Sequence, residues 1–488
     1  MNSVISSRRT IICAALLWVF IALLVGTGAS SEAEVMVIEG ATVIDCTGKP
    51  PIINGVVVIE GGKIKAVGRQ GKVTKPPGAR VVSAHGKYIL PGLIDMHVHY
   101  REWHGELFLA NGITTIKDLG NPVEWISELS RMQSEGKLRG PRIFYTGNNL
   151  DVPPPEGDHN VGVPSPEVSE RAVNLLFKLN VNAIKVRHKI TPESLSVIVK
   201  AAHARGIPVT GHLGATNASE AALAGIDGLE HASGVALAAA ETPGPPPSNV
   251  RGLNAFLEDL RGFAQMSRSK EAALIKLLVT RKVKLIPTLA IRRRAVVGTE
   301  GRERAVKEDD QIGRHPQLAY VPETVRRNWR EAPLDKGIQQ TFSKEQMQLM
   351  REGYQRLEEF VRELHRAGGF VLAGSDNLND VPGLTLHREL ESLVEAGLTP
   401  MEALIAATRD AAQFLRRRDL GTIEPGRTAD LIIVQASPLE NIRNLDVVEK
   451  VFQNGKEIEI GFHHDYALPP ARPSLVRPLF LERLLAEK

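Results

Sequence analysis

The sequence is poor in cysteine and in aromatic residues, and neither sign of charge dominates it. Its 488 residues contain two cysteines, Cys13 and Cys46, so no disulfide framework is available and the fold must depend on its core or on metal. Sixty basic residues face 56 acidic ones and are dispersed along the chain, which argues against a nucleic-acid-binding protein. With 43% hydrophobic residues the chain can build a sizeable core, which excludes a disordered, collagenous or disulfide-stapled protein.

The first thirty residues have the layout of a targeting segment. Arg8 and Arg9 precede an apolar run that ends at Val25, and small residues follow it. Because the run is shorter than the roughly 20 residues that span a bilayer, residues 1–30 are predicted to be a cleaved signal peptide. An uncleaved N-terminal anchor is the alternative. Both place the body of the protein outside the cytoplasm, in the periplasm or the extracellular space, and only the anchor implies contact with a membrane.

Both ends of the remaining chain have the composition of short β-strands. Residues 31–88 contain strand-forming runs such as GVVVIEGGKIKAVG, and residues 419–462 contain ADLIIVQA and VEKVFQNGKEIEI. Each piece is too small for a core of its own, so the two are predicted to pack together as one small β domain. Residues 463–488 are expected to form an extended tail that ends in a short helix.

Between these ends, residues 89–418 alternate apolar strands with helical segments, which is typical of βαβ units and a parallel sheet. The region contains eight strand candidates, and eight such units predict an α/β fold of the TIM (β/α)8 barrel type. Residues 241–343 are less regular and are predicted to contribute lid insertions over the barrel mouth. The strand candidates are YILPGLIDMHV, TTIKDL, RIFYTG, VNAIKV, PVTGHL, GLEHAS, VKLIPTL and FVLAGS.

Residues that bind metals or transfer protons fall at the ends of these strands. Because the carboxyl ends of barrel strands meet at one mouth, six polar side chains from five strands are expected to lie together. Imidazole and carboxylate groups suit zinc and similar divalent ions. The six residues are His97, His99, Lys185, His212, His231 and Asp376.

Each of these residues also has a simpler interpretation. An HxH pair can be accidental, Lys185 can be a solvated lysine at a strand end, and Asp376 can cap a following helix. His212 and His231 can be core histidines with satisfied hydrogen bonds. The joint pattern favours the metal site, because chance would have to place all six residues at strand ends in this order.

The sequence resembles the amidohydrolase superfamily of metal-dependent hydrolases, in the group similar to imidazolonepropionases and Xaa-Pro dipeptidases. The resemblance spans roughly residues 35 to 460 and implies a barrel flanked by a β-sandwich from both chain ends. The motifs that carry it are LPGLIDMHVH, NGITTIKDLG, AIKV, VTGHLG, GLEHAS, LAGSD, LHRELESLVEAGLTPMEALIAATRDAAQFL and LGTIEPGRTADLIIV.

The resemblance also implies a ligand set for two divalent metal ions, with zinc expected. His97, His99 and Asp376 match the ligands of the more buried ion, and His212 and His231 match those of the second. Lys185 matches the carboxylated lysine of the family, whose carbamate bridges both ions. An ammonium group could not take that role, because it has no lone pair and repels cations. Some members of the superfamily use only part of this set, so a mononuclear site stays open.

The implied reaction is hydrolysis of a carbon–nitrogen bond. A bridging hydroxide attacks a polarised carbonyl carbon, while Asp376 acts first as general base and then as general acid. His188 and His387 are weaker candidates for further donors, and alternation along the strand places His188 on a different face from Lys185.

The substrate is less well defined, because HLGAT and RHKI depart from the pattern of relatives at positions that line the pocket. A dipeptide or N-acyl amino acid is the leading hypothesis, with Arg187 and Arg292 as candidates for binding its carboxylate. A cyclic amide such as an imidazolone, an ester or a lactone is the alternative substrate. A further alternative is a metal-dependent binding protein that has lost catalysis. The sequence does not decide whether the chain forms a homo-oligomer.

Overall fold

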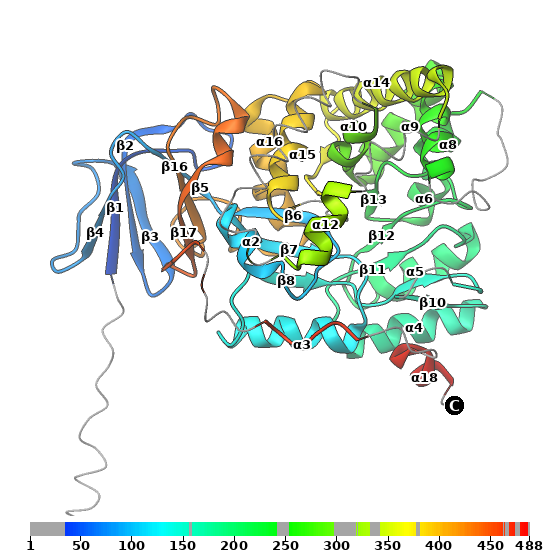
Figure 1. Cartoon of the computed structure of the whole chain (residues 1–488), viewed down its shortest axis with the longest axis horizontal. Helices are drawn as coiled ribbons and strands as arrows, with labels where there is room; N and C mark the ends of the chain where they lie inside the picture. Colours follow the sequence, from blue (N-terminus) through cyan, green and yellow to red (C-terminus); the bar gives the residue numbers. More distant parts are fainter. Residues whose placement is uncertain are drawn as a thin grey trace, which may run out of the picture.

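The computed structural model describes residues 35–155, 159–241, 253–296, 319, 321–331, 342–376, 381–461, 463, 468–473 and 479–486. The predicted signal peptide or anchor, residues 1–30, therefore lies outside the described residues. Over the ranges that are described, no helix is both long enough and apolar enough to cross a membrane. The chain forms a β-sheet unit beside a larger α/β unit (Figure 1).

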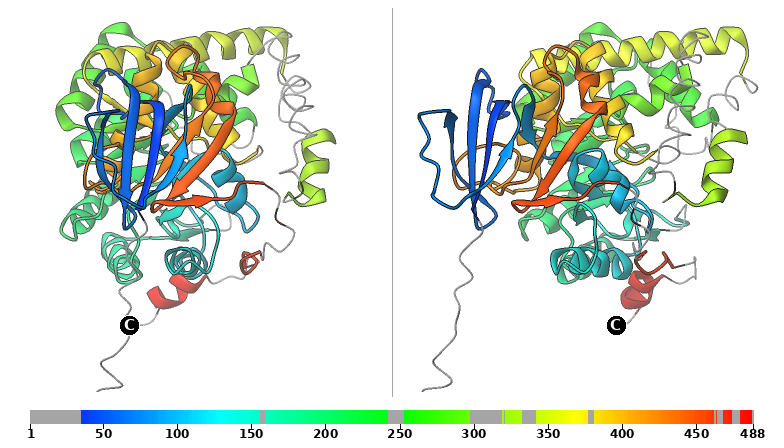
Figure 2. Two further views of the ribbon diagram at one scale, coloured as in Figure 1. Left: turned by 90° about the vertical axis from the view of Figure 1, so that its left-hand side faces the viewer. Right: turned by 60° about the vertical axis from the view of Figure 1, so that its left-hand side comes forward.

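The β-sheet unit combines strands from both ends of the chain, as predicted. Strand β16 pairs antiparallel with β5, so that Leu431 lies opposite Pro91 and Val434 opposite Tyr88. The blue N-terminal strands and the orange C-terminal strands therefore lie side by side (Figure 2). The strands are β1 (Val35–Val43), β2 (Ile52–Glu60), β3 (Lys63–Arg69), β4 (Arg80–Ser83), β5 (Tyr88–Pro91), β16 (Leu431–Val434), β17 (Val448–Gln453) and β18 (Lys456–Ile458).

These strands form one connected sheet in the order β18-β17-β16-β5-β1-β2-β3, with β4 paired to β1. The prediction of a sandwich is therefore correct in joining the two ends, but the strands are connected as a single sheet of eight. Valine and isoleucine side chains of both ends share one core, in which Ile38, Val57, Leu431 and Ile433 are buried. Burial of this shared apolar surface is the main force that holds the two ends together.

The predicted first barrel strand is in fact two strands that belong to different sheets. The run from Tyr88 to Val98 is broken at Gly92, which separates β5 from β6 (Leu93–Val98). A Cβ atom at Gly92 would lie 2.2 Å from Oγ1 of Thr114, so only glycine allows the backbone to pass there. The chain crosses from the β-sheet unit into the α/β unit at this point, because the absence of a side chain permits the close approach.

All eight predicted strands of the α/β unit are present. They occur in chain order and every pair between them is parallel. Two further strands of three residues each, β9 (Asn149–Asp151) and β10 (Asn160–Gly162), were not predicted. The eight are β6, β7 (Ile113–Asp118), β8 (Arg142–Tyr145), β11 (Ile184–Val186), β12 (Val209–Gly211), β13 (Gly228–Glu230), β14 (Lys284–Ile286) and β15 (Phe370–Val371).

A single closed ring of eight paired strands is not confirmed. The strands pair as a three-stranded sheet, β6-β7-β8, and a seven-stranded sheet, β10-β9-β11-β12-β13-β14-β15. Backbone hydrogen bonds still connect the first of these sheets to the residues that follow the last strand of the other. Met96 donates to the carbonyl of Ala373 at 3.0 Å, and Asp376 donates to the carbonyl of His97 at 2.8 Å. The residues after β15 therefore lie directly beside β6.

Helices follow most of these strands and cover the α/β unit. In both α4 and α5, proline stands in the first turn after a capping residue, Ser165 or Thr191. The others are α2 (Gly105–Ala110), α3 (Val123–Ser134), α6 (Ala218–Ala224), α7 (Val235–Ala239), α15 (Leu384–Glu395), α16 (Pro400–Ala406), α17 (Arg409–Phe414), the 3-10 helix η3 (Ile442–Asp446) and α18 (Phe480–Ala486). The bounds of the first two are α4 (Pro166–Lys178) and α5 (Pro192–His203).

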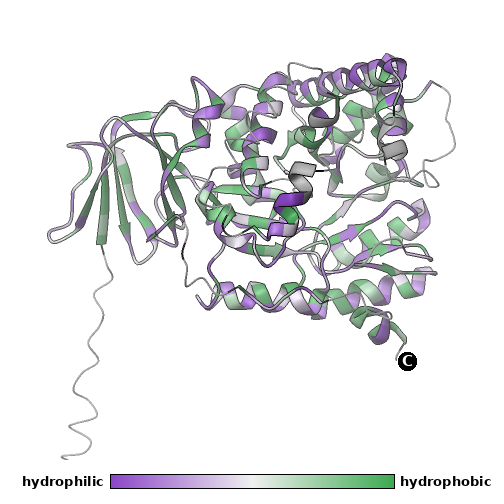
Figure 3. Cartoon of the chain, viewed as in Figure 1, coloured by the Kyte–Doolittle hydropathy of each residue, from purple (hydrophilic) through white to green (hydrophobic). Residues whose placement is uncertain are grey.

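The predicted insertion region, residues 241–343, lies partly outside the described residues. Its described parts form α8 (Leu253–Ala264), α9 (Arg268–Arg281), β14, α10 (Leu289–Val296) and α12 (Glu323–Glu331). The long helix α14 (Lys344–Arg366) follows it and is amphipathic, with Met350, Tyr354, Leu357 and Val361 buried at helical spacing (Figure 3). The prediction that parts of this region act as a lid stays a prediction.

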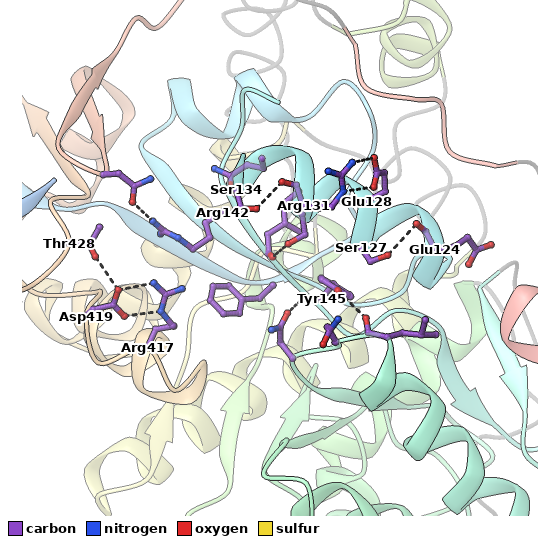
Figure 4. A pocket seen from close by; sticks show the side chains of 18 of the residues that line it. Glu124, Ser127, Glu128, Arg131, Ser134, Arg142, Tyr145, Arg417, Asp419 and Thr428 are labelled. Carbon is purple, nitrogen blue, oxygen red and sulfur yellow. Dashed lines mark hydrogen bonds and ion pairs between the residues drawn. The ribbon is translucent and has the colours of Figure 1, made fainter. Parts of the chain in front are cut away.

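A groove of about 860 Å³ lies at the amino ends of β8 and β11 (Figure 4). Arg142 of β8 lines it and connects the two units. It donates to Asp430 at 2.7 Å and to the side chain of Asn454 at 2.8 Å, and the Asp430 side chain is only 6% exposed. Asp430 directly precedes β16, so this ion pair joins the α/β unit to the β-sheet unit.

Replacement of Arg142 by alanine is expected to destabilise the fold by about 3 kcal/mol, because it leaves the Asp430 carboxylate buried without its cation. The matched control is Arg131→Ala in the same groove, where the side chain is 51% exposed and pairs with Glu128 and Glu135. That exposed pair is worth at most about 1 kcal/mol. Urea unfolding of both variants measures the difference, and equal losses would contradict the assigned role of Arg142.

Candidate metal centre

The predicted ligands lie at the carboxyl ends of five strands of the α/β unit. His97 lies in β6, His99 directly follows β6, and Lys185 lies in β11. All of them except His99 and His212 are buried or nearly so, as expected for a site enclosed by strand ends. The residues that follow β12, β13 and β15 are His212, His231 and Asp376.

Asp376 lies at the centre of this group. His97, His231 and Asp376 each offer one ligand atom, and these atoms lie within 4.8 Å of one another. The distances from the Asp376 carboxylate are 3.7 Å to Nε2 of His97, 3.7 Å to Nδ1 of His231 and 3.4 Å to Nε2 of His99. The geometry thus brings His231 to the same carboxylate as His97 and His99. How the ligands divide between two ions stays a prediction.

His212 and Lys185 complete the cluster on the side of His231. The ring centroid of His231 lies 4.4 Å from that of His212 and 4.4 Å from that of His97. Burial is the main cause that lowers the pKa values of His97, His99, His212 and His231, and the positive charge of Lys185 lowers all four further. The structure therefore brings all six predicted residues into one neighbourhood.

Two of these residues have a backbone conformation that residues other than glycine rarely adopt. His231 has φ of 60° and Asp376 has φ of 48°, both in the left-handed region. Thr288, which lies 2.8 Å from Nδ1 of His231 through its hydroxyl, has φ of 48°. Such conformations cost of order 1–3 kcal/mol each and cluster at functional sites. Here they aim the side chains that leave β13 and β15 into the cluster.

Three buried polar atoms of the cluster lack a hydrogen-bond partner among the residues that the structure describes. They are Nε2 of His97, Nζ of Lys185 and Oδ1 of Asp376. Buried polar groups are nearly always satisfied, so three such atoms in one place indicate a partner other than protein. Imidazole nitrogen and carboxylate oxygen are ligands that zinc and related ions accept. The residues therefore fit a divalent metal.

The site also favours the deprotonated forms of its basic groups. Burial is the main cause that lowers the pKa of Lys185 to about 7, although Glu230 opposes the shift. Burial likewise holds the pKa values of His99, His212 and His231 well below the ordinary value, and neighbouring positive groups lower them further. A metal needs the unprotonated forms of its ligands, so this environment favours metal binding at neutral pH.

A second layer of buried side chains supports the histidines, and the sequence analysis did not predict it. Glu230 accepts a hydrogen bond from Nδ1 of His97 at 2.7 Å and contacts Nζ of Lys117 at 3.0 Å. Burial alone would raise the pKa of Glu230, but Lys117, Lys185 and His97 hold it well below its ordinary value. The only feature of the sequence that pointed to Glu230 was its position directly before His231. Because neighbouring residues of a strand point to opposite faces, that position would predict that Glu230 points away from the site.

Two further histidines lie at the edge of the cluster. The ring of His159 lies 5.9 Å from that of His99, and this residue was not predicted. The ring of His188 lies 4.1 Å from that of His212, so the alternation argument against it was wrong. That argument failed because β11 ends at Val186 and the chain turns before His188. His387 instead contacts the carbonyl of Asn111 at 2.9 Å and Asp446 at 3.4 Å.

Both predicted arginines lie near the cluster. Nη1 of Arg187 lies 3.4 Å from Nδ1 of His212. Arg292, in α10, is only 7% exposed and forms an ion pair with Asp259. The charges of both arginines lower the pKa of His212 further, after the larger effect of burial. The region beside His212 is therefore electropositive.

The chain thus combines an α/β unit, with a buried His, Lys and Asp cluster at its strand ends, and a β-sheet built from both ends of the chain. The profile of the Amidohydrolase family matches residues 88–308 and 351–458, more than half of the chain. The chain belongs to the amidohydrolase family. All six predicted ligands lie within the matched residues.

Individual proteins similar to this chain include prolidase-like structures and an imidazolonepropionase. A candidate prolidase from Bifidobacterium longum covers 88% of this chain and 96% of its own, with a TM-score of 0.65 and 24% identity. A Xaa-Pro dipeptidase with bound methionine covers 87% and 100%, with a TM-score of 0.63 and 20% identity. The imidazolonepropionase of Pyrobaculum arsenaticum (strain DSM 13514 / JCM 11321 / PZ6) is 65% identical over 74 residues, 15% of this chain and 19% of that protein.

The first curated relatives are matched over only 15%, 16% and 19% of their own lengths. The structural neighbours share less than 25% of their residues with this chain and so show the fold. The family and these prolidase-like neighbours support the prediction of a metal-dependent hydrolase that acts on carbon–nitrogen bonds.

Replacement of Lys185 by alanine is expected to weaken metal binding at least tenfold, about 1.4 kcal/mol, because the protein loses the amine that the family resemblance implies carries a metal-binding carbamate. Metal titration and elemental analysis of purified protein measure the effect. The control is Lys284→Ala, since Lys284 begins β14 and lies at the opposite end of the strand from the cluster. Unchanged metal affinity in Lys185→Ala would contradict a role of Lys185 in the site.

Proposed function

We propose that this protein is an exported, metal-dependent hydrolase of a small amide, in which the eight strands act as one (β/α)8 barrel. The observation that carries the proposal is the meeting of three unpartnered buried atoms, from His97, Lys185 and Asp376, at the strand ends. The proposed substrate is a dipeptide or an N-acyl amino acid. Zinc is the proposed metal, with two ions per chain.

Divalent ions bound there would supply Lewis acidity, which polarises a carbonyl oxygen and makes water acidic near neutral pH. Four imidazoles and Asp376 would hold them. Lys185 is proposed to carry a carbamate. Its pKa of about 7 means that the neutral amine is abundant at neutral pH, and this amine takes up carbon dioxide with loss of one proton. The product is an anion that can bind cations, which the ammonium form cannot do.

Asp376 is proposed to transfer the proton. Its Oδ1 atom has no hydrogen-bond partner and lies 3.4 Å from His99 and 3.7 Å from His97. This oxygen can accept the proton of the attacking water and then deliver it to the departing nitrogen. The hydrogen bond from the Asp376 backbone to the His97 carbonyl keeps the carboxylate in place through both steps.

Arg187 is the better candidate for binding a substrate carboxylate. Nη1 of Arg187 lies 3.4 Å from Nδ1 of His212, whereas Arg292 lies in α10 and forms an ion pair with Asp259. Arg187 is half-buried at the carboxyl end of β11, two residues after Lys185. A guanidinium group in that place can form a bidentate pair with a carboxylate next to the scissile amide.

Replacement of Asp376 by asparagine is expected to lower turnover by about 10²- to 10⁴-fold, the usual size of a general acid–base contribution. Binding of a substrate analogue should survive, because the side chain keeps its shape. Steady-state kinetics and calorimetric titration separate the two effects. Asp227→Asn serves as the control, since Asp227 contacts His203 and the Val209 amide at the amino ends of the strands. Parent protein that binds substrate without turnover would indicate the non-catalytic alternative.

Replacement of Arg187 by methionine is expected to raise KM for N-acyl amino acids by about tenfold or more, because a charge-assisted hydrogen bond is worth about 1.5–3 kcal/mol. KM for the same compounds with an amidated terminus should stay unchanged. Arg292→Met should have a smaller effect. A panel of dipeptides and N-acyl amino acids, read by mass spectrometry, provides the assay. If metal-loaded protein cleaves none of them, cyclic amides, esters and lactones become the favoured substrates.

A further inference from the structure

Glu230 lies next to the candidate metal centre and forms hydrogen bonds with side chains of three other strands, β6, β7 and β12. Its side chain is fully buried at the end of β13, and His97 of β6 donates to its Oε2 atom at 2.7 Å. Lys117 of β7 donates to Oε1 at 3.0 Å, and Thr210 of β12 donates to the same atom at 2.5 Å. One carboxyl oxygen therefore serves His97 alone, and the other serves Lys117 and Thr210.

This arrangement determines which nitrogen of His97 carries the hydrogen. A carboxylate can only accept, so the neutral imidazole must have its hydrogen on Nδ1. The lone pair is then on Nε2, which has no hydrogen-bond partner and lies 3.7 Å from Oδ1 of Asp376. In metal sites a histidine often donates its second nitrogen to a carboxylate in this way, which sets its tautomer and its orientation.

We propose that Glu230 is a positioning residue that fixes His97 as the Nδ1–H tautomer, and that Lys117 orients Glu230 for this task. The proposal rests on the proposed function in one respect, that the Nε2 lone pair of His97 binds a metal ion. Glu230 and Lys117 do not reach the reacting atoms themselves. Their effect passes through His97.

The unequal sharing of the two carboxyl oxygens leads to a specific expectation for Glu230→Gln. The ammonium group of Lys117 can only donate, so the single oxygen of the new amide must face Lys117. The NH2 group of the amide then faces His97, which has to accept at Nδ1. His97 consequently carries its hydrogen on Nε2, and no lone pair points to the cluster.

Removal of Lys117 should reverse this effect. In the double variant Glu230→Gln/Lys117→Met, no ammonium holds the amide oxygen, so the amide can turn its oxygen back to His97. Its NH2 group would then donate to Thr210, whose hydroxyl can donate instead to the Gly228 carbonyl, 3.3 Å away. A side chain that merely fills space would not produce such a recovery.

The test is nitrogen NMR of ¹⁵N-histidine-labelled, metal-free protein, in which the two ring nitrogens report the tautomer. The His97 signal is assigned by its loss in His97→Asn. We expect Nδ1–H in the parent, Nε2–H in Glu230→Gln and Nδ1–H in the double variant. Glu389→Gln is the control, since Glu389 is equally buried but accepts from the Ala290 amide. Nε2–H in the parent, or no change in Glu230→Gln, would overturn the proposal.

Zinc titration of the same proteins gives a second readout. Glu230→Gln should bind zinc about 10- to 100-fold more weakly than the parent, and the double variant should recover most of that loss. A double variant that binds no better than Glu230→Gln overturns the role of Lys117. The expected tautomers in a parent that binds no metal would support the positioning role and contradict the proposed function, so the two failures are distinguishable.

Discussion

The arrangement depends on the close contact between β6 and the residues that follow β15. Two backbone hydrogen bonds, from Met96 to Ala373 and from Asp376 to His97, hold this contact. A Cβ atom at Gly374 would lie 2.8 Å from Cβ of His97 and 2.6 Å from Cγ2 of Ile286, so a larger residue would force the segments apart. This contact brings the only carboxylate among the predicted ligands to His97 and His99, although more than 270 residues separate Asp376 from them in the chain.

Buried polar groups of the α/β interior fall into two layers with opposite properties. In the inner layer, Glu230, Lys117 and Thr210 satisfy one another, so their burial costs little free energy. In the layer at the strand ends, His97, Lys185 and Asp376 each keep one atom without a protein partner. The hydrogen bonds of the inner layer hold the His97 side chain in one orientation, so its Nε2 atom stays directed at the strand ends.

The sequence was sufficient to predict the elements that depend on regular patterns. Apolar runs that alternate with helical segments gave all eight strands of the α/β unit. It did not predict the change of sheet at Gly92, because that depends on contact with Thr114 far along the chain. It also missed Glu230, since the left-handed backbone at His231 breaks the alternation that assigns strand faces.

The predicted metal ligands and the residues proposed to select the substrate differ in the same way, in whether they follow the regular strand pattern. The six predicted ligands lie on or just after strands, whose positions follow from burial of the core, and relatives with little sequence identity share this fold. His159, His188 and Arg187 instead lie where the chain has left a strand and is free of the core pattern. Substrate choice in such folds resides in these connecting segments. Arg187 lies where β11 ends and beside His212, so the carboxylate recognition proposed for it would act directly next to the predicted ligands.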